Sequence, residues 1–172
     1  IGLILIAISM THLFSSLLGG TSLVYYSNRL TTSTLFALTT LWSFIVSIVV
    51  AGIMALFLLY PPEYTYLVIA ISIVSNIMHS FLYIILGKER IIQHNILSLI
   101  QIIVHAIILS TVFLILKYQN INCYLISLLI SYIIGMFVGM WFCRKEIFPI
   151  SANGIIDVAK EIINYGFWVQ IS

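Results

Sequence analysis

Five long stretches of this chain contain no Asp, Glu, Lys or Arg: residues 1–28, 30–62, 64–87, 91–116 and 118–143. Each is longer than the roughly 20 residues that a helix needs to cross the hydrocarbon core of a bilayer. Lipid offers the backbone no hydrogen-bond partners, so a spanning segment must be a helix or a strand of a closed barrel. Barrel strands would be about ten residues long with strict alternation, which these stretches lack. We therefore expect an all-α, polytopic transmembrane helical bundle.

Composition supports lipid as the main solvent and excludes several classes of function. Charged residues make up 7% of the chain and apolar residues 62%, against about 25% and about half in typical soluble domains. The net charge of +2 is small, and the Lys and Arg residues are scattered at segment ends. A nucleic-acid partner is therefore not expected.

Catalytic constellations are also absent from the sequence pattern. The five apolar stretches hold no acid, so paired-carboxylate chemistry and an Asp-supported triad have no members there. No Gly-rich phosphate loop is present. His94 and His105 are about three helical turns apart, with no Cys or carboxylate to complete a metal site. We expect no enzyme, no cofactor and no bound metal.

The connections between the five stretches differ in basic residues. Arg29, Lys88 and Arg90 lie in two alternate connections, and Arg144, Lys145 and Lys160 follow the fifth stretch, whereas the opposite side has only Lys117. Cytoplasmic loops carry an excess of Lys and Arg, so the richer side is predicted to be cytoplasmic. The protein is accordingly expected to be a multi-pass protein of the cytoplasmic membrane, with Pro61 and Pro62 marking an outer connection.

The chain is expected to divide into three parts. Residues 1–143 would form a partial N-terminal transmembrane lobe, residues 144–154 a cytoplasmic linker, and residues 155–172 the start of a sixth transmembrane helix. Because the chain begins and ends within apolar patterns, we expect it to be a fragment of a longer protein whose remaining lobe is missing.

Polar residues inside the apolar stretches recur with helical spacing, which places them on one face of each helix. The three stripes are Thr11, Ser15, Ser22, Tyr25 and Arg29; Ser72, Asn76, His79 and Tyr83; and His94, Ser98, Gln101 and His105. They would line a common aqueous cavity if they converge. The alternative interpretation is that these residues simply form hydrogen bonds between helices.

Small residues and glycines add two expectations about packing. Ser127, Ser131, Gly135 and Gly139 repeat every four residues, a ridge that allows close approach of a neighbouring helix. Gly19 and Gly20 lie together within the first stretch and would allow a bend there.

Three motifs resemble the O-antigen and polysaccharide-unit flippases of the multidrug/oligosaccharidyl-lipid/polysaccharide exporter superfamily. Residues 19–29 (GGTSLVYYSNR) are similar to the cytoplasmic end of the family's second helix, and residues 86–95 (LGKERIIQHN) to the turn into its fifth. Residues 160–167 (KEIINYGF) with 170–172 (QIS) resemble the opening of its seventh helix. The order and spacing of the helices agree with this family.

The resemblance implies the function of a two-lobed exporter. Such a protein moves a polyprenyl-diphosphate-linked oligosaccharide across the cytoplasmic membrane by alternating access, with substrate held between its lobes. The substrate-binding residues expected here are Arg29, Asn76, His79, His94, Gln101 and His105, with Arg29 and His94 near the cytoplasmic entrance. The alternatives are a membrane glycan polymerase or ligase, a multidrug antiporter of the same superfamily, and a non-catalytic scaffold.

Overall fold

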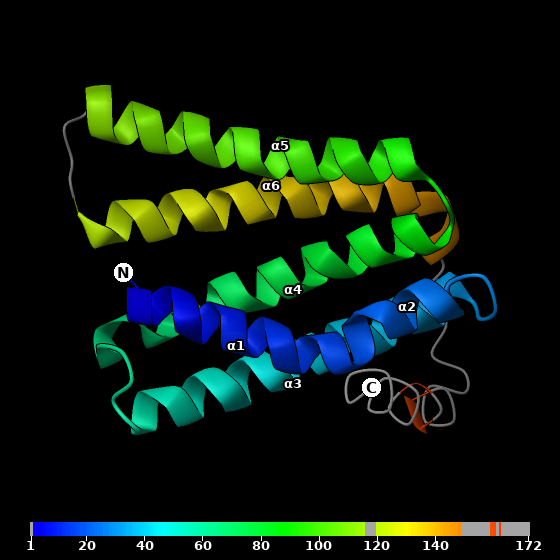
Figure 1. Cartoon of the computed structure of the whole chain (residues 1–172), viewed down its shortest axis with the longest axis horizontal. Helices are drawn as coiled ribbons and strands as arrows, with labels where there is room; N and C mark the ends of the chain where they lie inside the picture. The colour runs from blue at the N-terminus through cyan, green and yellow to red at the C-terminus, as the bar shows by residue number, and fades with distance from the viewer. Residues whose placement is uncertain (1, 116–119, 149–158, 161, 163–172) are drawn as a thin grey trace.

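The computed structural model describes residues 2–115, 120–148, 159, 160 and 162. The described part of the chain is all-α, as predicted (Figure 1). Its elements are α1 (Gly2–Gly19), α2 (Thr21–Tyr26), α3 (Thr32–Leu56), the 3-10 turn η1 (Pro62–Tyr64), α4 (Thr65–Gly87), α5 (Ile91–Ser110), the π-helical turn η2 (Thr111–Ile115) and α6 (Ile121–Ile147). Within this part, five segments are long and apolar enough to cross a membrane.

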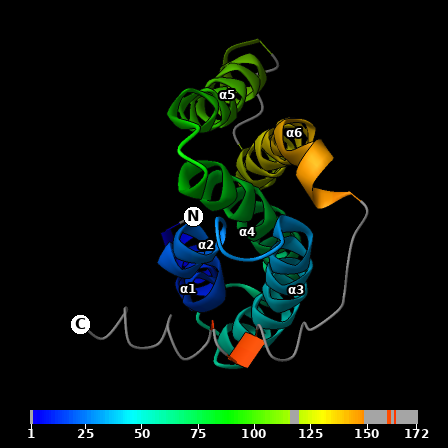
Figure 2. The same ribbon diagram turned by 90° about the vertical axis from the view of Figure 1, so that its right-hand side faces the viewer.

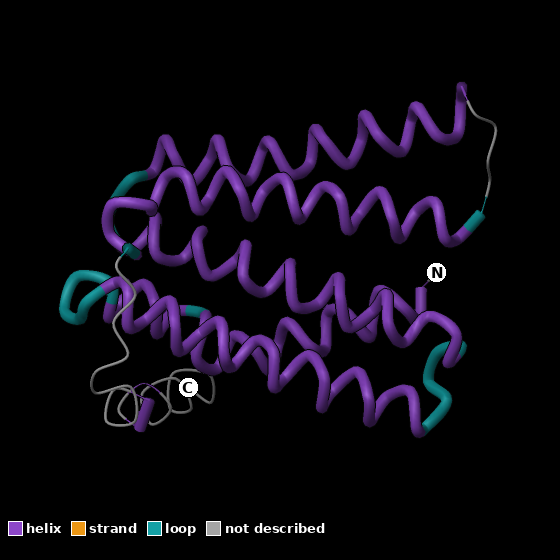
Figure 3. Tube along the Cα trace, turned by 180° about the vertical axis from the view of Figure 1, so that it is seen from behind, coloured by secondary structure: helices purple, strands orange, loops and turns teal. Residues whose placement is uncertain are grey.

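The long helices run along the same axis, with α5 and α6 at one edge and α1 and α3 at the other (Figure 1). Seen end-on, α4 lies between these two pairs (Figure 2). The turns gather at the two ends of the bundle, where consecutive helices reverse direction (Figure 3). This is the arrangement that short connections between spanning helices impose.

Helix α4 is the centre of the bundle and α5 is its periphery. In the most apolar part of the span that contains α4, 67% of residues are buried, against 6% in the span that contains α5. Fully buried Ile71 and Phe81 of α4 belong to the two apolar clusters that form the core. Helix α5 packs chiefly on α6, and its outer face is left to lipid.

The predicted bend in the first stretch is present. Helix α1 ends at Gly19, and α2 begins after Gly20, whose backbone angles (φ −92°, ψ −125°) are not helical. A Cβ atom on Gly20 would lie 2.7 Å from the carbonyl oxygen of Ser16. Glycine at this position therefore permits a close approach between the interrupted turn and the helix before it.

The first residues of the predicted linker are helical. Helix α6 continues past Cys143 and ends at Ile147, so residues 144–147 form its last turn. Ion pairs from Glu146 to the α4–α5 turn hold this last turn in place. Most of the predicted linker and sixth helix, and Lys117, lie outside the described residues.

The small-residue ridge of α6 packs against α4, as predicted. Ser127, Ser131, Gly135 and Gly139 are all buried. A Cβ atom on Gly139 would lie 2.8 Å from Cβ of Phe81, and one on Gly135 would lie 3.2 Å from Sδ of Met78. These contacts allow the backbones of the two helices to lie close together.

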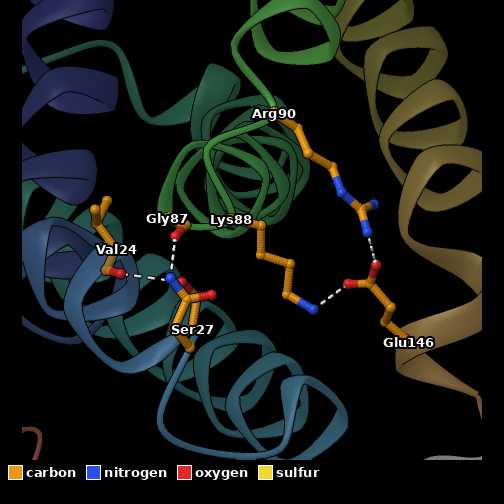
Figure 4. A network of polar contacts seen from close by, with 7 residues as sticks. Val24, Ser27, Gly87, Lys88, Arg90 and Glu146 are labelled. Atoms are coloured by element: carbon orange, nitrogen blue, oxygen red, sulfur yellow. Dashed lines mark hydrogen bonds and ion pairs between the residues drawn. The ribbon is translucent and has the colours of Figure 1, made fainter.

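The three connections predicted to share a side of the membrane do meet at one end of the bundle. The Asn28 side chain, in the turn after α2, donates a hydrogen bond to the carbonyl oxygen of Gly87 over 2.7 Å. Lys88 and Arg90, in the turn after α4, both form ion pairs with Glu146 of α6 (Figure 4). We call this the charged end of the bundle.

Candidate functional site

Six polar residues from three helices meet in the middle of the bundle. We define this central polar cluster as His12 and Ser15 of α1, Ser43 and Ser47 of α3, and Asn76 and His79 of α4. All six lie well inside spanning segments. The cluster is thus a polar site within hydrocarbon, where side chains of this kind need partners.

Hydrogen bonds through Asn76 link all three helices. Its Nδ2 atom donates to Oγ of Ser47 over 3.3 Å, and its Oδ1 atom lies 3.1 Å from Nδ1 of His12. Beside this chain, the hydroxyl oxygens of Ser15 and Ser43 lie 3.4 Å apart. Asn76 is buried, so its amide is satisfied by protein groups.

The two histidines of the cluster lie against each other. Their ring centroids are 4.3 Å apart, with the rings tilted by 47°. Nδ1 of His79 lies 2.7 Å from the carbonyl oxygen of Ser75, which can only accept, so this nitrogen carries a proton. The same argument gives His12 a proton on Nδ1, because the amide oxygen of Asn76 accepts there. With the proton on Nδ1, a neutral form of either ring would have Nε2 as an acceptor.

Two serine hydroxyls in or beside the cluster donate hydrogen bonds to the backbone of their own helices. Ser43 donates back to the carbonyl oxygen of Thr39 over 2.7 Å, and Ser80 to that of Asn76 over 3.0 Å. Such bonds to the preceding turn satisfy a hydroxyl inside a helix. Ser72 in the stripe of α4 is an exception, because its Oγ atom is buried with no hydrogen-bond partner among the described residues.

A small open recess lies over the cluster between α1 and α4. It has no room for a water-sized sphere. Its lining residues are His12, Ser15, Ser16, Gly19, Asn76, His79, Ser80 and Tyr83. In this conformation the site is a hydrogen-bonded contact between helices, and its lining contains no Asp, Glu, Lys or Arg.

The structure brings together the stripes of α1 and α4 but not that of α5. Asn76 and His79 lie in the cluster, whereas His105 faces α6: its Nδ1 lies 3.4 Å from Oγ of Ser127, and its ring meets Tyr124 edge-on at 5.4 Å. His94 is half-buried in the first turn of α5, where it contacts Asn95, and Gln101 is half-buried on the same helix.

Arg29 lies at the charged end, away from the cluster. Its side chain is exposed, and its guanidinium carbon stacks over the ring of Tyr25 at 4.1 Å from the centroid. Among the described residues, Arg29 forms no ion pair with an acid. It is thus a cation available to an anionic ligand at the membrane surface.

Sequence reasoning missed half of the cluster. His12 lies one position off the predicted stripe, and Ser43 and Ser47 were not assigned to any stripe. Thr39, Ser43 and Ser47 are spaced by four residues, the same signal that identified the other stripes.

Comparison with known proteins gives no match to a family model, to a curated protein or to a solved structure. Within the described residues, no group of three or more His, Cys, Asp or Glu residues is placed to hold a metal ion. The case for a function therefore depends on the geometry of the cluster and on the motifs in the sequence.

Proposed function

We propose that this chain is part of a flippase that moves a polyprenyl-diphosphate-linked oligosaccharide across the cytoplasmic membrane by alternating access. The observation that carries this proposal is the central polar cluster. It links three spanning helices through Asn76 and offers neutral hydroxyl, amide and imidazole groups deep in the bundle. Groups of this kind bind sugar hydroxyls without fixing a charge in hydrocarbon.

The recess has no space for substrate in this conformation, which fits a transporter better than a protein that holds its ligand permanently. With no space for a water-sized sphere, the recess between α1 and α4 holds no oligosaccharide in this conformation. Substrate would reach the cluster after a movement of the helices opens a cavity beside it. The break at Gly20, next to the recess, provides a point at which α1 can change its angle to α2.

Arg29 supplies the positive charge that the cluster lacks. The diphosphate of the substrate is anionic and lies at the membrane surface before transport, so an exposed arginine at the charged end suits its first contact. His94, in the first turn of α5 at the same end, would be a second contact.

A reconstituted transport assay tests this function. The full-length protein would be placed in liposomes containing a radiolabelled polyprenyl-diphosphate oligosaccharide, and the fraction of glycan open to an external glycosidase followed over time. We expect Asn76→Leu to lower the initial rate at least about tenfold, because it removes the hydrogen bonds that join the helices.

Two serine variants serve as a matched pair in the same assay. Ser47→Ala removes a partner of Asn76, whereas Ser98→Ala on α5 removes a hydroxyl whose bond is to the His94 carbonyl oxygen of its own helix. We expect a severalfold loss for the first and an unchanged rate for the second. A wild-type protein that moves no lipid-linked glycan refutes the proposed function.

A further inference from the structure

A second recess lies at the charged end, between the beginning of α5 and the end of α6. Its volume is about 370 Å³, enough for a phosphate-bearing headgroup. Its lining includes Arg90 and Gln93 from α5 and its preceding turn, and Trp141, Arg144, Lys145 and Glu146 from α6. None of these residues belongs to the central polar cluster, so the recess is a separate site.

The charges around this recess are unevenly matched. Glu146 is its one carboxylate among the described lining residues, and Lys88 and Arg90 already pair with it (Figure 4). Arg144 and Lys145 form no ion pair with any acid in the described part of the chain. The guanidinium of Arg144 is held over the ring of Trp141, 4.0 Å from its centroid. The recess therefore presents two uncompensated cations, one of them oriented by an aromatic ring.

Two polar features inside the recess call for a ligand with both an anion and a hydroxyl group. The Oε1 atom of Gln93 is buried and has no hydrogen-bond partner among the described residues. Helix α5 begins beside it with no side-chain cap on its first turn, and uncapped N–H groups at a helix start favour phosphate. An amide oxygen needs a donor, which a phosphodiester does not supply but a glycerol hydroxyl does.

The membrane side of the recess is apolar and open. Trp141 is 65% exposed, and Phe137, one turn deeper on the same face of α6, is 60% exposed. Ile92 of α5 is 77% exposed. Acyl chains that hang from a headgroup in the recess would lie along these side chains, with Trp141 at the level where interfacial aromatics are common.

We propose that this recess binds the headgroup of an anionic phospholipid that carries free hydroxyls, such as phosphatidylglycerol, from the leaflet at the charged end. Arg144 and Lys145 bind the phosphate, and a headgroup hydroxyl donates to Oε1 of Gln93. The lipid then bridges α5 and α6 at the end where their packing depends on the ion pairs of Glu146. Basic recesses between helix ends at this depth are typical sites for acidic lipids. The proposal does not depend on the transported substrate.

Lipid binding to the purified full-length protein tests the proposal. Native mass spectrometry would compare binding of phosphatidylglycerol and phosphatidylcholine with matched acyl chains, with inorganic phosphate as the free-anion probe. We expect phosphatidylglycerol to bind at least about tenfold more tightly than phosphatidylcholine. Equal binding of the two lipids overturns the proposal, and so does inorganic phosphate that displaces phosphatidylglycerol at equal concentration, because it would show a soluble-anion site.

Variants that each remove one positive charge show whether lipid binding depends on the recess itself or on the overall positive charge of this end. Arg144→Gln should weaken phosphatidylglycerol binding about tenfold, and Gln93→Leu should remove the preference for phosphatidylglycerol over phosphatidylmethanol, a phosphodiester lipid that lacks the hydroxyls. Lys160→Gln removes an exposed cation that does not line the recess, so it should leave binding unchanged. If Lys160→Gln weakens binding as much as Arg144→Gln does, the site assignment is wrong.

Discussion

Several side chains buried in the middle of this bundle are polar, although apolar side chains could pack there. Asn76 is the clearest case, because its amide bonds two other helices at once. Interhelical bonds of this kind each contribute about 0.6 kcal/mol on average in membrane proteins. Their contribution to stability is modest, so the clustering of six such residues is better explained by a requirement for polar groups at this depth. Transport of a hydroxyl-rich substrate would impose that requirement.

Arg29 is the residue on which the transport proposal makes its sharpest claim. Arg29→Ala should reduce translocation of lipid-linked oligosaccharide to less than about a tenth of wild type, because the diphosphate would lose a charge-assisted contact. Since the side chain is exposed and its described contact is stacking on Tyr25, membrane expression should remain normal. The rate is measured in reconstituted liposomes, alongside a quantitative blot of the membrane fraction.

Arg29→Lys is the control for that prediction. It keeps the charge but loses the planar, bidentate geometry of the guanidinium, so an intermediate rate is expected. Full activity of Arg29→Ala would remove Arg29 from the substrate site.

At the scale of the helices, the packing of α4 on α6 depends on glycine. Gly139→Ala should destabilise the protein by about 1–3 kcal/mol, because the new Cβ would overlap with Phe81 and force the backbones apart. Gly52→Ala in α3 is the matched control, since a Cβ there meets nothing within 4 Å. Its effect should be neutral or slightly stabilising, because alanine is the better helix former.

The two glycine variants are compared by thermal unfolding in detergent. A transition temperature for Gly139→Ala equal to that of Gly52→Ala would mean that α4 and α6 are not closely packed at this point.

The sequence was a good guide to the helices and a partial guide to how they face one another. Spans, the break at Gly20 and the ridge containing Gly139 all follow from local composition and spacing, which a single helix displays by itself. The partner of a polar stripe is decided by packing between helices, which spacing does not encode. His105 therefore bonds Ser127 of α6, although its stripe resembles those of α1 and α4. Ser47 was missed because a helical serine can equally well bond its own backbone.

At the scale of the whole molecule, the two ends of the bundle differ in charge within the described part of the chain. Turns containing Arg29, Lys88 and Arg90 meet the last turn of α6 at the first, whereas the connection at the other end that the structure describes contains Pro61, Pro62 and Glu63. The positive-inside rule predicts that the charged end faces the cytoplasm. The proposed contact between the substrate diphosphate and Arg29 depends on this orientation.

Labelling of single cysteines in intact cells tests the orientation directly. In a background with Cys123 and Cys143 replaced by serine, cysteines would be placed at exposed Glu89 and Lys145 of the charged end and at exposed Glu63 of the other. A membrane-impermeant maleimide should label the cysteine at Glu63 in intact cells, but those at Glu89 and Lys145 only after permeabilisation, because only the outer end faces the reagent. Labelling of Lys145→Cys in intact cells would show that the charged end faces outward. Substrate would then meet Arg29 only after it had crossed the membrane. The cysteine at Glu63 also controls for reagent quality, since its labelling should not change on permeabilisation.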